Sequence, residues 1–406
     1  MTLSIAFLHP DLGIGGAERL VIDAALALQD KGHKVTLFCA HVDRHRCFEE
    51  IRQGVLQVKV FGRFLPLHIG QRLRAPCALL RMTYLTLALM RQHCRYDVIV
   101  CDLVPHVIPL LRLFSRAKIL YYCHFPDLLH ASGSGLLYRF YRKPIDWLEQ
   151  KGTAAAHRVL VNSHFTAAVF QNTFKSLGNM TPEVVYPGIN IDWYNTNNIG
   201  PRQAVENSDS EILVLLISRF EAKKNLGLAI DAVALLRRLL PADLFGRVRL
   251  IIAGGYDPRL AEDRETLNYL QSQAAKLGLQ GQVDFVLNGT DAERLALILR
   301  SRCIVYTPAN EHFGLVPVEA MAVGRPVIAV NSGGPLETVC DGETGLLCEP
   351  EAQAFAAAMG RLIMDAETAK RMGQAGRERA ARCFSRAVFG DRLEAIIREM
   401  VIEPSP

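Results

Sequence analysis

Two glutamates, Glu311 and Glu319, have seven residues between them and lie on either side of Gly314. The apolar run just before them, Ile304–Pro308, predicts a buried parallel strand, and the residues after Gly314 have the composition of a helix. A glycine turn between a strand and a helix presents unpaired N–H groups and a positive dipole end. The pattern therefore predicts an anion site flanked by two carboxylates.

A second apolar run, Pro326–Val330, leads into a second glycine turn at Gly333 and Gly334, and Glu337 follows. We expect this turn to present its N–H groups to an anion in the same way. Two such turns with flanking carboxylates favour a ligand that is anionic in its middle and rich in hydroxyls at both ends. A nucleotide diphosphate sugar has that chemistry.

Two cations, Arg219 and Lys224, follow the apolar run Ile212–Ile217. The carboxyl end of such a strand is where open α/β sheets bind ligands. A departing pyrophosphate needs its charge neutralised by cationic side chains or by a metal ion. Because the sequence contains no D-x-D pair, we expect cationic side chains and no metal. Two adjacent lysines, such as those at positions 223 and 224, usually lie on a solvated face. The position of this pair near Arg219 at a strand end favours a functional role.

A glycine loop containing Gly15 and Gly16 follows the apolar run Leu3–Leu8 and precedes a helix. Such a loop resembles a dinucleotide-binding turn. A nicotinamide enzyme would carry an acid after its second strand, where this chain has Ala40 and His41, so that function is disfavoured. Two interpretations stay open: a tight structural turn, or a loop that closes over a ligand held mainly by another domain.

His124 follows the apolar run Lys118–Tyr122 and precedes Phe-Pro. A histidine at the carboxyl end of a strand could hydrogen-bond a sugar hydroxyl or move a proton. A histidine whose bonds are satisfied within its own loop is the alternative, and from position alone it is the commoner case. The position of His312, beside Glu311, does not indicate its role.

The length of 406 residues exceeds what one compact core accommodates, so we expect two domains. Half of the residues are hydrophobic and 21% are charged, which is typical of a globular protein. The ten cysteines show no C-x-x-C pair, and no signal peptide is visible, which together favour a reducing, cytosolic environment. A net charge of only +5 gives no indication of nucleic-acid binding.

Apolar runs alternate with helical stretches, the pattern of parallel α/β layers. In the first half we expect strands at Leu3–Leu8, Val35–Cys39, Val55–Val60, Asp97–Cys101, Lys118–Tyr122 and Val159–Asn162. In the second half we expect them at Ile212–Ile217, Leu250–Ala253, Val283–Val286, Cys303–Tyr306, Val327–Val330 and Gly345–Cys348. The fold class is therefore α/β, with two Rossmann-like doubly wound domains.

The polar stretch Asn195–Ser210 predicts an interdomain linker. We accordingly expect an N-terminal domain over residues 1–194 and a C-terminal domain over residues 195–385. A last helix, about Arg386 to Met400, lies beyond them, within residues 386–406.

Residues 51–96 contain no acid and eight bases: Arg52, Lys59, Arg63, Arg72, Arg74, Arg81, Arg91 and Arg95. They include the apolar run Pro76–Met90, which is too short and too interrupted for a membrane span. One interpretation is a basic amphipathic helix on an anionic membrane surface. In that case acidic replacements at Arg72, Arg74 and Arg81 would weaken liposome binding. The other interpretation is a core helix with a solvated basic rim, and the two are compatible.

Together these segments resemble the retaining glycosyltransferases of GT-B fold in glycosyltransferase family 4. The two glutamates match its E-x7-E motif, and Arg219 and Lys224 match its phosphate-binding pair. Gly15 and Gly16 match its N-terminal glycine loop, and His124 matches its first-domain histidine. Order and spacing agree over almost the whole chain. The resemblance implies two Rossmann-like domains facing a cleft, with a C-terminal helix that packs back on the first.

Within that family the chain resembles the mannosyltransferases of dolichol-linked oligosaccharide assembly, through stretches such as YYCHFPDLL, VNSHFTAAVF and YTPANEHFGLVPVEAM. This resemblance implies GDP-mannose as donor and Man1GlcNAc2-diphosphodolichol as acceptor, which receives an α-1,3 and then an α-1,6 mannose. It implies a peripheral or monotopic enzyme on the cytosolic face of the endoplasmic reticulum, and it is compatible with a complex of the pathway's mannosyltransferases. A related transferase with another lipid or a soluble acceptor, and a non-catalytic scaffold of this fold, are the alternatives.

The resemblance also assigns roles to the site residues. Glu319 accepts from the ribose hydroxyls, and Glu311 accepts from the mannose hydroxyls. Arg219, Lys224 and the N–H groups around Gly314 and Leu315 hold the diphosphate. His124 positions the donor sugar or the acceptor from the first domain, so that catalysis requires domain closure.

Overall fold

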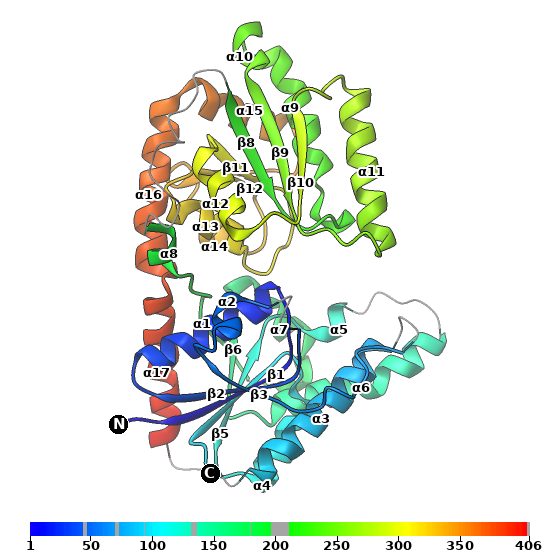
Figure 1. Ribbon diagram of the computed structural model, residues 1–406, viewed down its shortest axis with the longest axis vertical. Helices are drawn as coiled ribbons and strands as arrows, with labels where there is room; N and C mark the ends of the chain where they lie inside the picture. Colours follow the sequence, from blue (N-terminus) through cyan, green and yellow to red (C-terminus); the bar gives the residue numbers. More distant parts are fainter. Residues whose placement is uncertain are drawn as a thin grey trace. The chain divides into compact units, whose positions relative to one another are not determined.

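The computed structural model (Figure 1) describes residues 1–43, 47–69, 73–92, 94–130, 136–178, 180–195 and 211–403. The chain forms two compact units, Met1–Gly188 with Arg386–Pro406, and Ile189–Ser385. The boundary thus lies slightly before the expected one at 194/195. Almost all of the expected linker, from 196 to 210, lies outside the described residues.

The first unit is built on a seven-stranded sheet in the order β3-β2-β1-β4-β5-β6-β7, in which every neighbouring pair is parallel. All six expected strands are present, with ends shifted by a few residues. β1 runs past its expected end at Leu8 and includes His9. The strands are β1 Ser4–Leu12, β2 Lys34–Val42, β3 Gln57–Val60, β4 Val98–Asp102, β5 Lys118–Cys123, β6 Arg158–Val161 and β7 Glu183–Val184.

Helices cover both faces of this sheet. On one face α1 and α17 bury a core with strand residues, and on the other face α3, α4 and α7 bury a second core. The approach of α17 to α1 is close, since a Cβ at Gly390 would lie 2.7 Å from Cβ of Ala27. The helices are α1 Gly16–Asp30, α2 Glu49–Arg52, α3 Arg74–Arg91, α4 Ile108–Phe114, α5 Asp127–His130, α6 Leu136–Ala154, α7 His164–Thr173 and α17 Arg386–Ile402, with 3-10 turns at Pro105–Val107 and Lys175–Leu177.

The position of α3 corrects one expectation about the basic segment. Arg81 is buried, and its guanidinium forms an ion pair with Asp11 at the end of β1. This ion pair connects α3 to the sheet, and Arg81 does not face a membrane. A buried arginine needs such a partner, because an unpaired buried charge would be strongly unfavourable. Arg72 and the side chain of Arg74 lie outside the described residues. Among the residues that the structure describes, no helix has the length and apolar character needed to cross a membrane.

The second unit is built on a six-stranded parallel sheet in the order β10-β9-β8-β11-β12-β13. All six strands expected in this half are present: β8 Ile212–Ile217, β9 Val248–Gly254, β10 Val283–Leu287, β11 Cys303–Tyr306, β12 Val327–Val330 and β13 Gly345–Cys348. The helices are α8 Ile191–Asn195, α9 Gly227–Leu239, α10 Ala242–Gly246, α11 Ala261–Lys276, α12 Asp291–Arg300, α13 Leu315–Ala322, α14 Pro335–Thr338, α15 Ala352–Met364 and α16 Ala366–Phe384, with a 3-10 turn at Ala222–Lys224.

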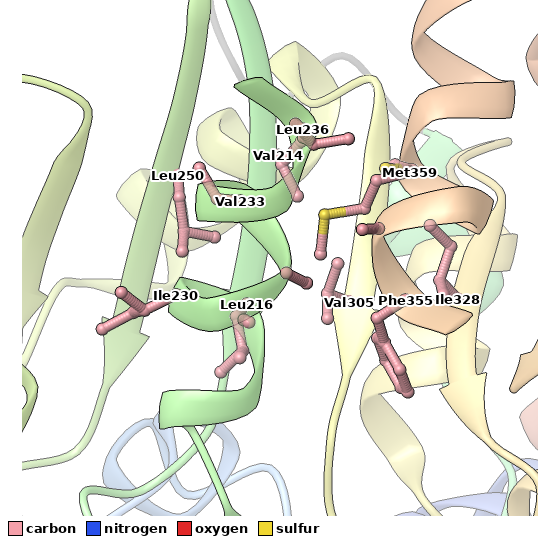
Figure 2. Close-up of a cluster of buried hydrophobic side chains, with 14 of the residues drawn as sticks. Val214, Leu216, Ile230, Val233, Leu236, Leu250, Val305, Ile328, Phe355 and Met359 are labelled. Atoms are coloured by element: carbon pink, nitrogen blue, oxygen red, sulfur yellow. The ribbon is translucent and has the colours of Figure 1, made fainter. Parts of the chain in front are cut away.

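The core of this unit lies between the sheet and helices α9 and α15. In Figure 2 the labelled side chains come from both helices and from four strands, pack together and are fully buried. Burial of this kind stabilises the fold by about 25 cal/mol per Å² of apolar surface removed from water. The labelled side chains are Val214, Leu216, Ile230, Val233, Leu236, Leu250, Val305, Ile328, Phe355 and Met359.

Candidate active site

The strand order of the second sheet contains one reversal. From β8 the chain builds outward through β9 and β10, and then returns to place β11 on the other side of β8. At such a switch point the connections leave in opposite directions, which opens a crevice at the carboxyl ends of the two strands. Lys224 follows β8 and Glu311 follows β11, so both lie where ligands of open α/β sheets bind.

Lys224 and Glu311 form an ion pair, with 2.5 Å between Nζ and Oε2. The backbone next to it is fixed by Thr307, whose hydroxyl donates to the carbonyl of Lys224 at 2.7 Å. Burial alone would raise the pKa of Glu311, but the charge and hydrogen bond of Lys224 outweigh it and lower that pKa. Both side chains remain about one-fifth exposed, 18% for Lys224 and 20% for Glu311. The pair is therefore charged and within reach of a ligand.

Gly314 is the N-cap of α13, and its backbone has φ +85°, in the left-handed region that glycine tolerates best. A Cβ there would lie 3.3 Å from the Tyr306 ring. The N–H groups of Leu315 and Val316 have no intrahelical acceptor and lie at the positive end of the helix dipole, whereas Pro317 has no N–H. This start of α13 fits the expected anion site.

Glu319 is buried within α13 and forms an ion pair with Arg294 of α12. The pair neutralises a carboxylate that would otherwise be costly to bury. Sequence reasoning missed Arg294, because nothing in the composition of α12 distinguishes it from other surface arginines. The one available signal was that a buried Glu319 requires a cationic partner.

The N–H of Gly334 in the second glycine turn is taken by the protein itself, which corrects the expectation for that residue. The N–H of Gly334 donates to the carbonyl of Glu311 at 2.7 Å. A Cβ at Gly334 would lie 2.3 Å from Cα of Phe313, and one at Gly333 would lie 2.5 Å from the carbonyl oxygen of Glu311. The turn is packed against the loop that carries Glu311 and holds that loop in position.

Arg219 is not part of the Lys224–Glu311 pair. Its guanidinium lies 3.1 Å from the carboxylate of Glu221, which also pairs with Lys223 at 3.1 Å. The Arg219 side chain is 69% exposed. It therefore lies on the surface, and its contact with a diphosphate stays a prediction.

In the first unit, Gly15 caps the start of α1 and Gly16 is its first residue. Their contact with the donor stays a prediction. His124 follows β5, and its Nε2 lies 2.6 Å from Oδ1 of Asp102, the last residue of β4. On the other side of that carboxylate, Nδ1 of His9 lies 2.6 Å from Oδ2. Sequence reasoning missed both Asp102 and His9.

Glu149 supports the segment after His124. Its two carboxylate oxygens accept from the N–H groups of Asp127 and Leu128 at 2.7 and 3.0 Å, at the start of α5. Burial raises the pKa of Glu149 to about 7 even though these bonds act in the opposite direction. The group therefore titrates near neutral pH in the folded protein.

We expect this titration to make stability depend on pH. The folded protein holds the Glu149 proton up to about pH 7, whereas the unfolded chain releases it near 4.5. The stabilisation is thus full below pH 4.5 and is lost as the pH rises through 7, in total on the order of 3 kcal/mol. Urea unfolding midpoints from pH 5 to 8 should fall more steeply for the wild-type chain than for Glu149→Gln. Equal slopes would contradict the assignment.

Two family profiles match the chain. Residues 14–193 match the profile described as Glycosyltransferase Family 4, and residues 201–379 match Glycosyl transferases group 1. The α-1,3/1,6-mannosyltransferase ALG2 of Homo sapiens is 44% identical over 403 residues, covering 98% of this chain and 96% of the human protein. The ALG2 enzyme of Saccharomyces cerevisiae is 42% identical over 362 residues, covering 83% of this chain and 71% of the yeast protein.

Solved structures support the fold. Sucrose-phosphate synthase from Thermosynechococcus elongatus superposes with a TM-score of 0.77 at 24% identity, covering 98% of this chain and 99% of that one. Anabaena Alr3699/HepE, solved in complex with UDP and glucose, gives 0.71 at 22% identity, covering 98% of this chain and 100% of that one. The expected two-domain GT-B architecture is confirmed.

Proposed function

The chain belongs to the α-1,3/1,6-mannosyltransferases of lipid-linked oligosaccharide synthesis, and from this membership we propose that its donor is GDP-mannose. It is a glycosyltransferase that uses a sugar nucleotide and forms α-1,3 and α-1,6 mannosidic bonds. The acceptor in this proposal is Man1GlcNAc2-diphosphodolichol, which the first unit receives. The observation that carries the donor assignment is the Lys224–Glu311 pair beside the start of α13.

The donor extends across the carboxyl ends of β8 and β11 in this proposal. Glu319 accepts from the two ribose hydroxyls with its two oxygens, while Arg294 forms an ion pair with that carboxylate. Lys224 and the first turn of α13 hold the diphosphate. Glu311 accepts from mannose hydroxyls, and its pairing with Lys224 holds the sugar and phosphate contacts in a fixed relation.

The acceptor hydroxyl attacks the anomeric carbon on the face from which GDP departs. The bond to the phosphate oxygen breaks with its electron pair going to that oxygen, the new glycosidic bond forms, and the same oxygen takes the hydroxyl proton. Configuration is retained without a covalent enzyme intermediate. The two glutamates then hold the donor and do not act as the acid and nucleophile of a retaining glycosidase. Lys224 stabilises the charge that develops on the leaving group.

The decisive experiment is incubation with GDP-mannose and a synthetic lipid-diphosphate Man1GlcNAc2 acceptor, followed by linkage analysis. We expect an α-1,3-linked and then an α-1,6-linked mannose. We also propose that no divalent ion is needed, so a chelator should leave turnover unchanged. Turnover only with another sugar nucleotide, or only with a soluble acceptor, would favour the related transferase activities. Absence of turnover with every donor would favour a scaffold.

We further propose that the enzyme acts at the cytosolic face of the endoplasmic reticulum, held to the membrane peripherally or monotopically and compatible with a complex of the pathway's mannosyltransferases. The face of α3 opposite its buried side exposes Leu80 and Leu87, which are 51% and 41% exposed. Arg91, at its end, and Arg63, before it, are also exposed. Apolar side chains with a basic rim are the composition of a helix that lies in a membrane interface.

Replacing both Leu80 and Leu87 with Gln should weaken sedimentation with anionic liposomes roughly tenfold, since less apolar surface then enters the interface. The change leaves the buried side of α3 intact, so the circular dichroism spectrum should not change. Leu239→Gln, a replacement of an equally exposed leucine (49%) on α9, is the matched control and should bind as the wild type does. Unchanged liposome binding by the double variant would refute α3 as the contact.

A further inference from the structure

The first sheet has a strand-order reversal of its own, between β1 and β4. The carboxyl ends of these two strands are therefore also a ligand-binding position. His9 lies in β1, Asp102 ends β4, and His124 follows the neighbouring strand β5. His9 and Asp102 are fully buried, whereas the His124 side chain is 13% exposed. One carboxylate thus lies between two imidazoles, and only one of these imidazoles reaches the surface.

The hydrogen bonds fix which ring nitrogens carry protons. Burial alone would raise the pKa of Asp102, but the charge of His124 and the bonds from both histidines lower it to about 2. An ionised carboxylate only accepts hydrogen bonds. The facing nitrogens, Nε2 of His124 and Nδ1 of His9, are therefore both protonated. The nitrogen of His124 that points away from Asp102 is Nδ1, which in the neutral ring is an acceptor for a hydroxyl.

The burial of His9 has an unfavourable free energy that packing alone does not explain. Its Nε2 is buried and has no hydrogen-bond partner among the described residues. An unsatisfied buried polar atom costs about 1–3 kcal/mol, which an apolar side chain of similar size would avoid. Burial lowers the pKa of His9, yet the bond and charge of Asp102 outweigh it and raise that pKa above its ordinary value. The bond to Asp102 is therefore what this buried histidine provides.

We propose that Asp102 and His9 are positioning residues for His124: Asp102 fixes the Nε2–H tautomer, His9 fixes Asp102, and Nδ1 of His124 is thereby held as the acceptor for a substrate hydroxyl. This inference rests on the proposed role of His124 in mannose transfer. It adds to that role the atom which makes the contact and the two buried groups which orient that atom.

Other ionisable groups face the cluster. Asp11 and Glu18, from β1 and α1, act on His9 through their charges. Cys101, Tyr122 and Cys123, from β4 and β5, are all sensitive to the charge of Asp102 and all have raised pKa values, so they are neutral near pH 7. Asp102 is thus the charge bonded directly to both imidazoles. Its removal should change the pH at which the cluster binds a proton.

The test uses the full chain, GDP-mannose and the lipid-diphosphate acceptor. Asp102→Asn should lower kcat about 100-fold with little change in the KM for GDP-mannose. The acid limb of its pH–rate profile should move to lower pH, because the negative charge that favours ring protonation is gone. A normal kcat and profile, with only a lower melting temperature, would mean that Asp102 is structural and would overturn the proposal.

A pair of variants at His9 keeps the test decisive if Asp102→Asn does not fold. Asn has an amide nitrogen where His has Nδ1, so His9→Asn preserves the donor to Asp102, whereas His9→Leu removes it. We expect His9→Asn to stay within about threefold of wild-type kcat. We expect His9→Leu to lose at least tenfold, with a shifted pH profile. Equal kcat and equal profiles in these two variants would overturn the proposal.

His33→Asn is the matched control, because His33 is also a buried histidine of the first unit with a carboxylate partner, Glu394 at 3.1 Å. It should be less stable than the wild type but should have the same kcat and pH profile. Lys224→Ala distinguishes a failure of this inference from a failure of the proposed function. If Lys224→Ala is inactive and the Asp102 and His9 variants behave as wild type, only this inference fails. If Lys224→Ala turns over normally, the proposed donor site itself fails.

Discussion

Replacing Lys224 with alanine is expected to lower kcat/KM for GDP-mannose by about 10²–10³-fold. Lys224 is the cation at the carboxyl end of β8 that pairs with Glu311, 2.5 Å away. Without it the departing diphosphate loses a preorganised positive charge, and the negative charge of Glu311 repels the donor. The loss of charge stabilisation acts on the transition state and lowers kcat, whereas the repulsion weakens donor binding and raises KM. We expect the fall in kcat to be the larger of the two effects.

Lys223 provides a matched control for that experiment. It is adjacent in sequence, has the same charge and is 68% exposed, and it pairs with Glu221 instead of Glu311. Lys223→Ala should therefore retain activity within about threefold, as exposed ion pairs contribute little. Steady-state kinetics of the two variants, with melting temperatures to verify folding, show whether the loss is specific to Lys224. Equal losses would indicate a diffuse electrostatic effect, and normal activity of Lys224→Ala would remove the donor-site assignment.

Replacing Gly334 with alanine is expected to lower kcat about 100-fold although Gly334 contacts no substrate in the proposed mechanism. The added Cβ would lie 2.3 Å from both Cα and the carbonyl oxygen of Phe313. These are backbone atoms, so no change of side-chain rotamer relieves the clash. The loop before α13 must then move, and it carries Glu311, whose carbonyl oxygen accepts from the N–H of Gly334 at 2.7 Å. A shift of about 1 Å in a positioning group costs roughly this factor.

Gly281→Ala is the control for this change, because a Cβ at Gly281 meets no atom within 4 Å. It should leave both kcat and the melting temperature near their wild-type values. Measurement of kcat together with the melting temperature separates a displaced loop from a collapsed fold. Wild-type kcat in Gly334→Ala would show that the turn does not position Glu311.

Local signals were sufficient to predict the strands of both sheets and the residues at their carboxyl ends. The exception was β7, which has two residues and is too short to show periodicity. Lys224 and Glu311 were predictable as site residues because each follows an apolar strand. Their direct pairing was not, because it depends on β8 and β11 being neighbours in the sheet.

The sequence interpretation failed where a partner is distant along the chain. The sequence left Arg81 open to a membrane-surface role because its ion-pair partner, Asp11, is separated from it by 70 positions. Asp102 was missed because its partner His9 is 93 positions away and the carboxylate belongs to no motif. The N–H of Gly334 was assigned to a ligand because the carbonyl that takes it becomes visible only in three dimensions.

The return of the chain to the first unit has a consequence for biosynthesis. Five buried side chains of the first unit's core belong to α17: Phe389, Leu393, Ile396, Ile397 and Met400. A ribosome makes them only after the whole of Ile189–Ser385, which takes roughly 10–40 s at 5–20 residues per second. During that interval α1 has an uncovered apolar face, and by its end the second unit has every strand that it needs. The unit that is synthesised first is therefore the last to complete its core, and until then it is the part of the nascent chain most in need of a chaperone.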